Sequence, residues 1–415
     1  MSVLREPKLA SESTQNVLLI LNVGSATIKF QVFSCEPEPQ TLLGGTFDHG
    51  VNPPAVKLKS GSVSPERLHR MAASLAHATD SVEPYVWEIM RLMEDLRWRV
   101  VAVGHRVVHG GEHFQQATLV DENVIESIAR LIPCAPLHQA ESLSAMKAVG
   151  AYDRGLTQVA CFDTAFHANL PLEARSFAIP RQWSDQGVRR YGFHGLSFAS
   201  IAQQLSAENI VGSNERTVIA HLGSGSSICG LVDGVSQATT MGMTPLDGVP
   251  MATRCGGIDP GAILYLINEQ HVDSHQLQKA LYCESGLKGL SQLSGDMRVL
   301  LASEEPDAKA AVDYFVYWAA REIASIAAAI EGLDVLVFSG GIGEHSSEIR
   351  RRICQRLAWL DVMIDPAANN RHPHQIHLAT SRVRIFVFPA NEEKIIVQQI
   401  SRIVAQQIGD SYPVV

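Results

Sequence analysis

Two segments of the 415-residue chain, about 200 residues apart, repeat the same local pattern. Each has an apolar, β-prone run, a turn of small polar residues and a second apolar run, at residues 17–33 and again at residues 217–232. This pattern predicts a β-hairpin of two buried strands. Because the motif occurs in both halves, it indicates a duplicated α/β domain with a cleft between the copies, although a strand–turn–strand motif also arises by chance.

The rest of the chain alternates predicted helices and strands. A polar stretch at residues 1–16 is expected to be a disordered leader, and residues 34–63, rich in Pro, Gly and Ser, to form loops and short strands. Helices are predicted at 64–98, 121–131, 138–149, 346–358 and 393–408. Further strands are predicted at 100–103, 157–162, 335–338 and 385–388.

Length and charge limit the classes of protein that fit. At about 150 residues per domain, the length suggests two or three domains. Lys and Arg number 34 against 43 Asp and Glu, which gives a net charge of −9. Nucleic-acid binding is not expected, because it needs clustered positive charge. The tight basic run at 350–352, beside Glu348, is interpreted as a solvated helix face.

The cysteines and the apolar segments point to a cytoplasmic protein. Seven cysteines are scattered without CxxC spacing, which argues against a zinc knuckle and a disulfide framework. The N-terminal stretch lacks the apolar core of a signal peptide. No segment has 18 uninterrupted apolar residues, so no membrane span is expected.

Three glycine-rich turns follow predicted strands, at Gly24-Ser25, at 223–227 and at 340–343. Glycine lets backbone N–H groups approach an anion closely, and a helix N-terminus after the third turn favours phosphate. Neither the GxxxxGK[ST] pattern nor GxGxxG in a strand–helix unit is present, so a P-loop or Rossmann site is not expected. Lys29, on the returning strand, suits a phosphate contact or a solvated strand position.

Several charged or polar residues stand beside such turns or at strand ends. Arg106 and Arg254 lie in glycine-containing segments, which suits recognition of planar anions, although each alone also suits a structural ion pair. Asp163 follows a predicted strand. Asn22 and Glu392 lie at the ends of two others, where α/β clefts collect functional groups.

Three histidines, His105, His109 and His113, are spaced by four residues. On a helix this spacing would place their imidazoles on one face, as in a metal site. The glycines and β-branched residues between them favour a strand and loop, so a zinc site is not expected here.

Eight short segments in a fixed order give the chain a resemblance to the acetate kinase family, within the superfamily of actin-like, sugar-kinase and chaperone ATPases. The segments are 22–25, 103–111, 161–167, 190–195, 221–225, 241–259, 339–344 and 389–393. The resemblance implies two duplicated actin-like (ribonuclease H-like) α/β domains with a nucleotide cleft between them. It places the N-terminal domain at 17–165 and the nucleotide-binding domain at 166–393, with a C-terminal helix at about 394–415 returning to the first.

The resemblance also implies roles for individual residues. The catalytic positions are Asp163, His194, Arg254, Arg106 and His138. Arg106 would bind the substrate carboxylate, and the methyl pocket would be Val108, Leu137, Phe193 and Pro245. The positions for ATP or ADP are Lys29, His221, Leu222, Gly223, Ser224, Gly225, Asp296, Met297, Arg298, Gly341, Ile342, Gly343, Glu344 and His345. Asn22 and Glu392 would hold Mg²⁺, with Mn²⁺ as an alternative.

The implied reaction is reversible transfer of the ATP γ-phosphate to acetate by direct in-line displacement. A carboxylate with a pKa near 4 is already ionised at neutral pH, so no strong base is needed. We therefore expect Asp163 to orient magnesium or an arginine. Three positions depart from the residues that are usual in the family. This chain has Ser224 and His345 where the family usually has Asn, and Gly257 where the family usually has Asp. These departures leave the nucleotide preference and the rate open.

Other functions are weighed against acetate kinase activity. A propionate kinase or a broader short-chain acyl kinase is the alternative with the most similar substrate. An enzyme discriminates between two acids that differ by one methylene by only about 1–3 kcal/mol. A sugar or glycerol kinase would need a base for a hydroxyl and would not need Arg106. A non-catalytic nucleotide-binding actin-like protein would not need Arg106, Asp163, His194 and Arg254 together. The expected partners are acetate and ATP, and the resemblance implies a homodimer.

Overall fold

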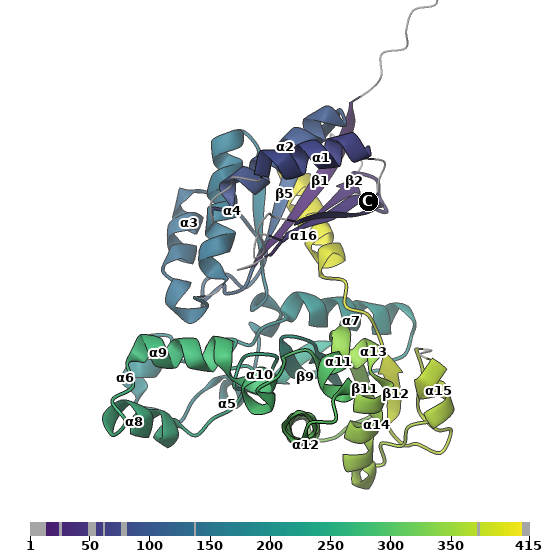
Figure 1. Cartoon of the computed structure of the whole chain (residues 1–415). Helices are drawn as coiled ribbons and strands as arrows, with labels where there is room; N and C mark the ends of the chain where they lie inside the picture. Colours follow the sequence, from purple (N-terminus) through teal and green to yellow (C-terminus); the bar gives the residue numbers. More distant parts are fainter. Residues whose placement is uncertain are drawn as a thin grey trace, which may run out of the picture.

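The computed structural model describes residues 14–24, 27–48, 55–60, 63–75, 81–136, 138–371 and 374–408. Most of the predicted leader lies outside them, and the first strand begins at Gln15. Seven strands form one sheet in the order β4-β3-β2-β1-β5-β7-β6 (Figure 1). They are β1 (Gln15–Val23), β2 (Thr27–Ser34), β3 (Thr41–Asp48), β4 (Ala55–Ser60), β5 (Trp98–Val107), β6 (Thr118–Leu119) and β7 (Thr157–Phe162).

A second sheet has five strands in the order β10-β9-β8-β11-β12. They are β8 (Arg216–Leu222), β9 (Ser226–Val232), β10 (Val235–Thr239), β11 (Val335–Ser339) and β12 (Arg384–Val387). In each sheet an antiparallel hairpin, β1–β2 or β8–β9, is followed by a third antiparallel strand, and two parallel strands lie on the other side of the first strand. This shared order confirms the duplicated α/β architecture predicted from the repeated hairpin motif.

Helices cover both faces of the first sheet. They are α1 (Pro65–Leu75), α2 (Glu83–Asp95), α3 (Glu122–Ala129), α4 (Gln139–Tyr152) and α16 (Glu392–Ile408). Alternate side chains of β1 enter different cores: Val17, Leu19 and Leu21 pack with α1, α2 and α4, whereas Leu18 and Ile20 pack with α16. Gly104 allows α16 to approach β5, because a Cβ there would lie 2.6 Å from Ile396 Cγ2.

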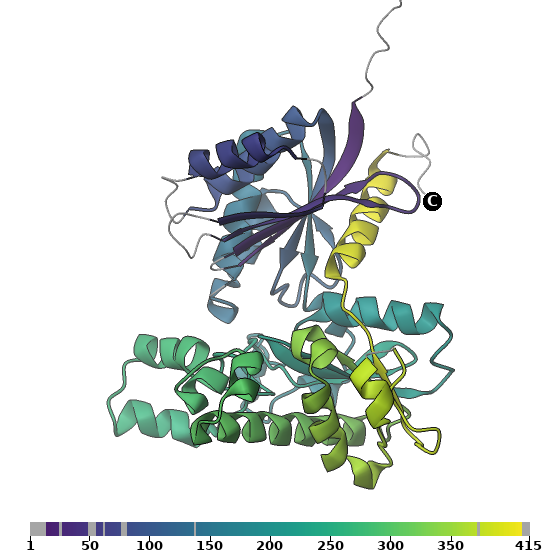
Figure 2. The same cartoon turned by 45° about the vertical axis from the view of Figure 1, so that its right-hand side comes forward.

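The second sheet is likewise covered on both faces, by α7 (Gly195–Ala207) on one and by α12 (Pro306–Ala329) and α14 (Ser347–Arg356) on the other. Figures 1 and 2 show α7 along the junction between the two sheets, where it contacts α16. The shorter helices are α5 (Leu172–Arg175), α6 (Arg181–Ser184), α8 (Pro260–Asn268), α9 (Ser274–Lys279), α10 (Gly286–Ser291), α11 (Met297–Ala302), α13 (Gly340–His345) and α15 (Pro366–Arg371). Among the described residues, no helix is long and apolar enough to cross a membrane.

The basic run at 350–352 departs from its prediction at its first residue. Arg350 is fully buried, and its guanidinium donates to the carbonyls of Gly343 and Glu344 and to Asn369. It shares a helix face with the core residues Ile349 and Ile353 of α14, so it cannot reach solvent. The prediction of a solvated helix face is correct for Arg351, which forms an ion pair with Glu348 at 2.7 Å.

Three buried histidines make the stability of the fold sensitive to acid. Burial lowers the pKa of His105, His109 and His167 to about 4. In the unfolded chain each takes up a proton near pH 6.5, so the unfolded state binds more protons between about pH 6.5 and 4. We expect the free energy of unfolding to fall as the pH drops through this window.

Urea denaturation at several pH values measures this effect. The His105→Gln variant keeps a polar side chain beside Gln158, whose Oε1 lies 2.8 Å from His105 Nε2, and should weaken the pH dependence. His69→Gln, at an exposed position on α1, is the matched control and should leave it unchanged. An equal slope in the His105→Gln variant and the parent would contradict the prediction.

Candidate active site

The carboxyl ends of β5 and β7 bring an arginine and two carboxylates together. Arg106 Nη2 donates to Asp163 Oδ2 at 2.8 Å, and Nε lies 3.2 Å from both Asp163 oxygens. Arg106 Nη1 pairs with Glu392 Oε2 at 3.1 Å, at the first residue of α16. β5 and β7 are parallel neighbours, so residues far apart in sequence meet at one sheet edge. Arg106 is thereby fixed in orientation by two partners.

The two carboxylates of this cluster have different electrostatic surroundings. Burial raises the pKa of Asp163 to about 6, against the opposing effect of Arg106. Burial would also raise the pKa of Glu392, but Arg106, the Ser197 hydroxyl and Lys29 together hold it below its ordinary value. The Arg106 guanidinium therefore opposes the effect of burial on both carboxylates and favours their ionised forms.

A second cluster lies at the start of α7 and beside the turn between β8 and β9. His194 takes a left-handed conformation with φ of 57°, and its Nδ1 lies 2.8 Å from Ser227 Oγ. A Cβ on Gly225 would lie 3.1 Å from His194 Nε2 and 2.6 Å from Arg254 Nη2. The glycine therefore lets the turn lie directly against both side chains. The Gly195 N–H donates to the Asp163 carbonyl at 2.8 Å, which joins this cluster to the first.

Arg254 differs from Arg106 in its partners. Its Nη1 donates to the Pro245 carbonyl at 2.6 Å. Among the described residues, no carboxylate forms an ion pair with it. Burial lowers the pKa of Arg254 to about 10, and Arg106 adds to that effect. A buried guanidinium without a counter-ion favours an anion bound beside it.

The second and third glycine-rich turns lie next to each other. A Cβ on Gly223 would lie 3.8 Å from the Gly341 nitrogen. Gly340 has φ of +75°, and its N–H donates to the Glu344 carboxylate at 2.9 Å. A Cβ on Gly341 would have no neighbour within 4 Å, so there is open space beside this residue. The arrangement suits phosphate binding, because short glycine turns expose N–H groups to an anion.

A small apolar cluster lies beside the two arginines. Val108 and Phe193 pack with three residues that the sequence did not single out: Ala135, Met241 and Met251. Pro245 is buried nearby in the chain that follows Met241. Leu137, the fourth expected member, lies outside the described residues. The two methionines fall in the segment 241–259 that carried the family resemblance, which is the signal that could have identified them.

Comparison with known proteins decides the family. The model of the acetokinase family matches residues 17–398. An acetate kinase of Nitrobacter hamburgensis is 44% identical over 383 residues, covering 92% of this chain and 94% of the relative. The chain belongs to the acetokinase family.

Solved structures agree with this acetokinase fold. A propionate kinase of Francisella tularensis is 32% identical, with a TM-score of 0.83 over 92% of this chain and 98% of that one. An acetate kinase of Porphyromonas gingivalis is 27% identical, with a TM-score of 0.76 over 94% of this chain and 100% of that one. The two sheets of this acetokinase are thus the two domains of an actin-like fold.

Not all of the expected site residues of this acetokinase meet in the two clusters. Asp296 and Arg298 pair with each other at the surface, 2.6 Å apart, and the Met297 side chain lies in the core. His345 is 81% exposed. His138 lies at the N-terminal cap of α4. The nucleotide roles of Asp296, Arg298 and His345 stay predictions.

Proposed function

We propose that this acetokinase transfers the γ-phosphate of ATP to acetate, and in reverse from acetyl phosphate to ADP, by direct in-line displacement. The observation that carries the proposal is the meeting of Arg106, Arg254 and His194 with the Gly225 turn beside a small apolar cluster. Two anions must approach each other in this reaction. Fixed positive groups and backbone dipoles stabilise that arrangement.

The chemistry of the substrate accounts for the role proposed for Asp163. Acetate is ionised near neutral pH, so its oxygen attacks the γ-phosphorus without losing a proton. Asp163 then has no proton to accept, and its hydrogen bonds from Nε and Nη2 of Arg106 orient the guanidinium. His194 stays neutral, because burial and the neighbouring His221, Arg106 and Arg254 lower its pKa. It would donate a hydrogen bond from Nε2 to a transferring phosphoryl oxygen.

The family uses a divalent metal with its nucleotide, and we propose Mg²⁺, with Mn²⁺ as an alternative, beside Asn22 and Glu392. Asn22 comes directly after Leu21, which pairs with His105 of β5, and Glu392 forms an ion pair with the next residue of β5, Arg106. Both residues offer oxygen ligands. Among the described residues, no group of three His, Cys, Asp or Glu side chains could hold a metal. This sparse set fits Mg²⁺, which keeps several waters and takes its remaining ligands from phosphates. When bound, the ion would neutralise phosphate charge.

A hydroxamate assay of acyl phosphate tests the proposed function. Acetate, propionate and butyrate are each supplied with ATP and magnesium, and we expect the fastest formation with acetate because Val108 narrows the apolar cluster. Val108→Ala should move the ratio of kcat/KM toward propionate by roughly tenfold, since one methylene is worth about 1–3 kcal/mol. Faster turnover of propionate by the parent would favour a propionate kinase. Acyl phosphate from none of the three acids would overturn the proposal.

We also propose that the chain forms a homodimer in the cytoplasm. On α8, Leu264 and Tyr265 are more than half exposed, and none of the residues of this apolar helix is buried. Such a surface fits a second copy of the chain. Sedimentation should show a dimer, and Leu264→Glu should weaken it. All seven cysteines are free, which fits a reducing compartment.

A further inference from the structure

A short loop, Met241–Asp247, connects the apolar cluster to Arg254. Its first residue, Met241, packs against Val108 and Phe193. Pro245, near its middle, accepts a hydrogen bond from Arg254 Nη1 at 2.6 Å. The position of this loop therefore sets both the shape of the apolar cluster and the direction of a guanidinium that has no carboxylate partner among the described residues.

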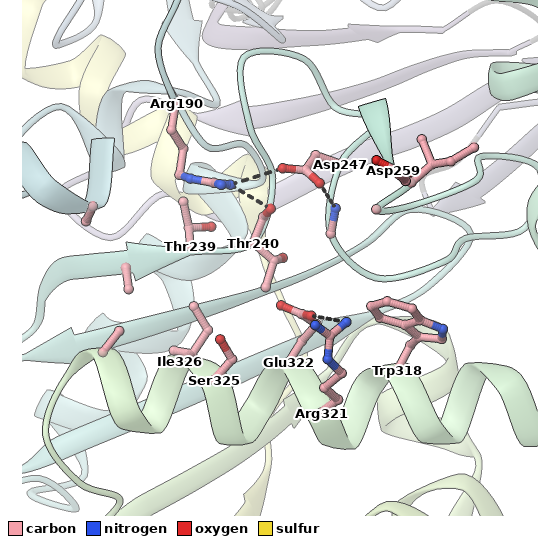
Figure 3. Close-up of a pocket in the computed structure, with 16 residues that line it drawn as sticks. Arg190, Thr239, Thr240, Asp247, Asp259, Trp318, Arg321, Glu322, Ser325 and Ile326 are labelled. Carbon is pink, nitrogen blue, oxygen red and sulfur yellow. Dashed lines mark hydrogen bonds and ion pairs between the residues drawn. The ribbon is translucent and has the colours of Figure 1, made fainter. Parts of the chain in front are cut away.

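The Arg190 side chain contacts both ends of this loop. Arg190 Nη1 donates to the carbonyls of Thr240 and Met241 at 2.8 and 2.9 Å, and it lies 3.4 Å from Asp247 Oδ2. Figure 3 shows Arg190 above a cavity, with dashed lines to Thr240 and Asp247 and with α12 on the opposite side. The same guanidinium thus contacts both ends of the loop, and residues 242–246 lie between them.

The tip of the loop is held from the first domain. His109 Nδ1 accepts from the Gly111 N–H at 2.9 Å, so the ring proton is on Nε2. That Nε2–H donates to the Met243 carbonyl at 3.1 Å. The histidine ring also lies against Phe193, with centroids 5.3 Å apart. Arg190 at the base and His109 at the tip therefore hold the loop at three places around Pro245.

We propose that Arg190 is a positioning residue for phosphoryl transfer, because it holds the Met241–Asp247 loop where the Pro245 carbonyl orients Arg254. The proposal rests on the proposed acetate kinase activity. Among the described residues, Arg190 has no hydrogen bond or ion pair with the glycine turns at 223–227 and 340–343 or with Glu392, so its effect should reach Arg254 and the acetate side of the site, and should spare nucleotide binding. Since its side chain lines a cavity of about 550 Å³, water can replace its hydrogen bonds when it is removed.

Arg190→Ala tests the proposal through separate kinetic constants. We expect kcat to fall roughly tenfold to hundredfold and the KM for acetate to rise, with the KM for ATP within about twofold, because small misplacement of a catalytic group has effects of this size. Added guanidinium at millimolar concentration should enter the cavity and restore part of kcat. Asp247→Asn, which removes the negative charge beside Arg190 but keeps an acceptor oxygen, should show a smaller loss in the same constants.

Arg321→Ala is the matched control. Arg321 lines the same cavity, but it stacks on Trp318 and pairs with Glu322 without touching the loop. It should keep the parent's constants. Arg190→Ala with unchanged kcat and acetate KM would overturn the proposal, as would a loss that guanidinium does not relieve and that a lower Tm accompanies. An inactive parent chain would instead refute the proposed function.

Discussion

Arg254→Ala should lower kcat by roughly 10²- to 10³-fold and leave the free energy of unfolding unchanged or slightly higher. The loss of rate has the size found when one preorganised donor to a developing negative charge is removed. The guanidinium is buried beside Gly225 and His194, where a transferring phosphoryl group would lie. Stability should not suffer, because burial already lowers the pKa of Arg254 and it has no carboxylate partner among the described residues. A group that is buried unpaired destabilises the folded state.

The measurement combines steady-state kinetics with urea denaturation. Arg254→Lys keeps a positive charge but loses the planar donor geometry, so it should recover only part of kcat. Arg181→Ala removes an arginine that is 93% exposed on α6 and is the control for both quantities. Near-normal turnover in Arg254→Ala would remove this residue from the site. A marked fall in stability would contradict the argument from unpaired burial.

The sequence predicts those parts of the molecule that follow from local patterns. The hairpins at β1–β2 and β8–β9 each arise from one apolar–turn–apolar run, and their repetition is sufficient to predict the two sheets. Glycine turns are local in the same way. Arg106 lies near the end of β5 and Asp163 directly after β7, so their convergence follows once these two strands are taken as parallel neighbours. Glu392 follows β12 of the second sheet and reaches Arg106 only because α16, which it begins, packs on the first sheet.

Contacts that depend on how distant segments pack together could not be predicted from local sequence patterns. Arg350 belongs to a basic run typical of an exposed helix face, and only its place opposite Asn369 shows that it is buried. Met251 and Ala135 reach the apolar cluster through loop conformations, for which the sequence has no periodicity to indicate a direction. By contrast, the strand and loop predicted from the glycines and β-branched residues around His105 and His109 are confirmed, because β5 contains His105 and His109 lies in the loop after it.

Asp163→Asn should lower both stability and activity, in contrast to the change at Arg254. Asp163 is 1% exposed and accepts hydrogen bonds from Nε and Nη2 of Arg106, so its neutral replacement leaves Glu392 as the only carboxylate in an ion pair with this guanidinium among the described residues. Removing one partner of a buried ion pair costs about 3–5 kcal/mol. We expect a loss near the lower end of this range, because Glu392 remains. Turnover should fall by 10²-fold or more, since Arg106 loses its fixed orientation.

A double-mutant cycle separates the two effects. Asp163→Asn with Arg106→Gln replaces the pair by two neutral groups that can hydrogen-bond, and it should recover much of the lost stability but none of the activity. A solvent deuterium isotope effect near one on the parent's kcat should accompany this, because Asp163 accepts no proton. Recovery of activity in the double variant would refute the assigned role of Arg106. Failure to recover stability would mean that the fold itself depends on this pair. The expected outcome assigns the pair to anion chemistry, because an ion pair kept for folding alone could be exchanged for neutral groups without loss of turnover.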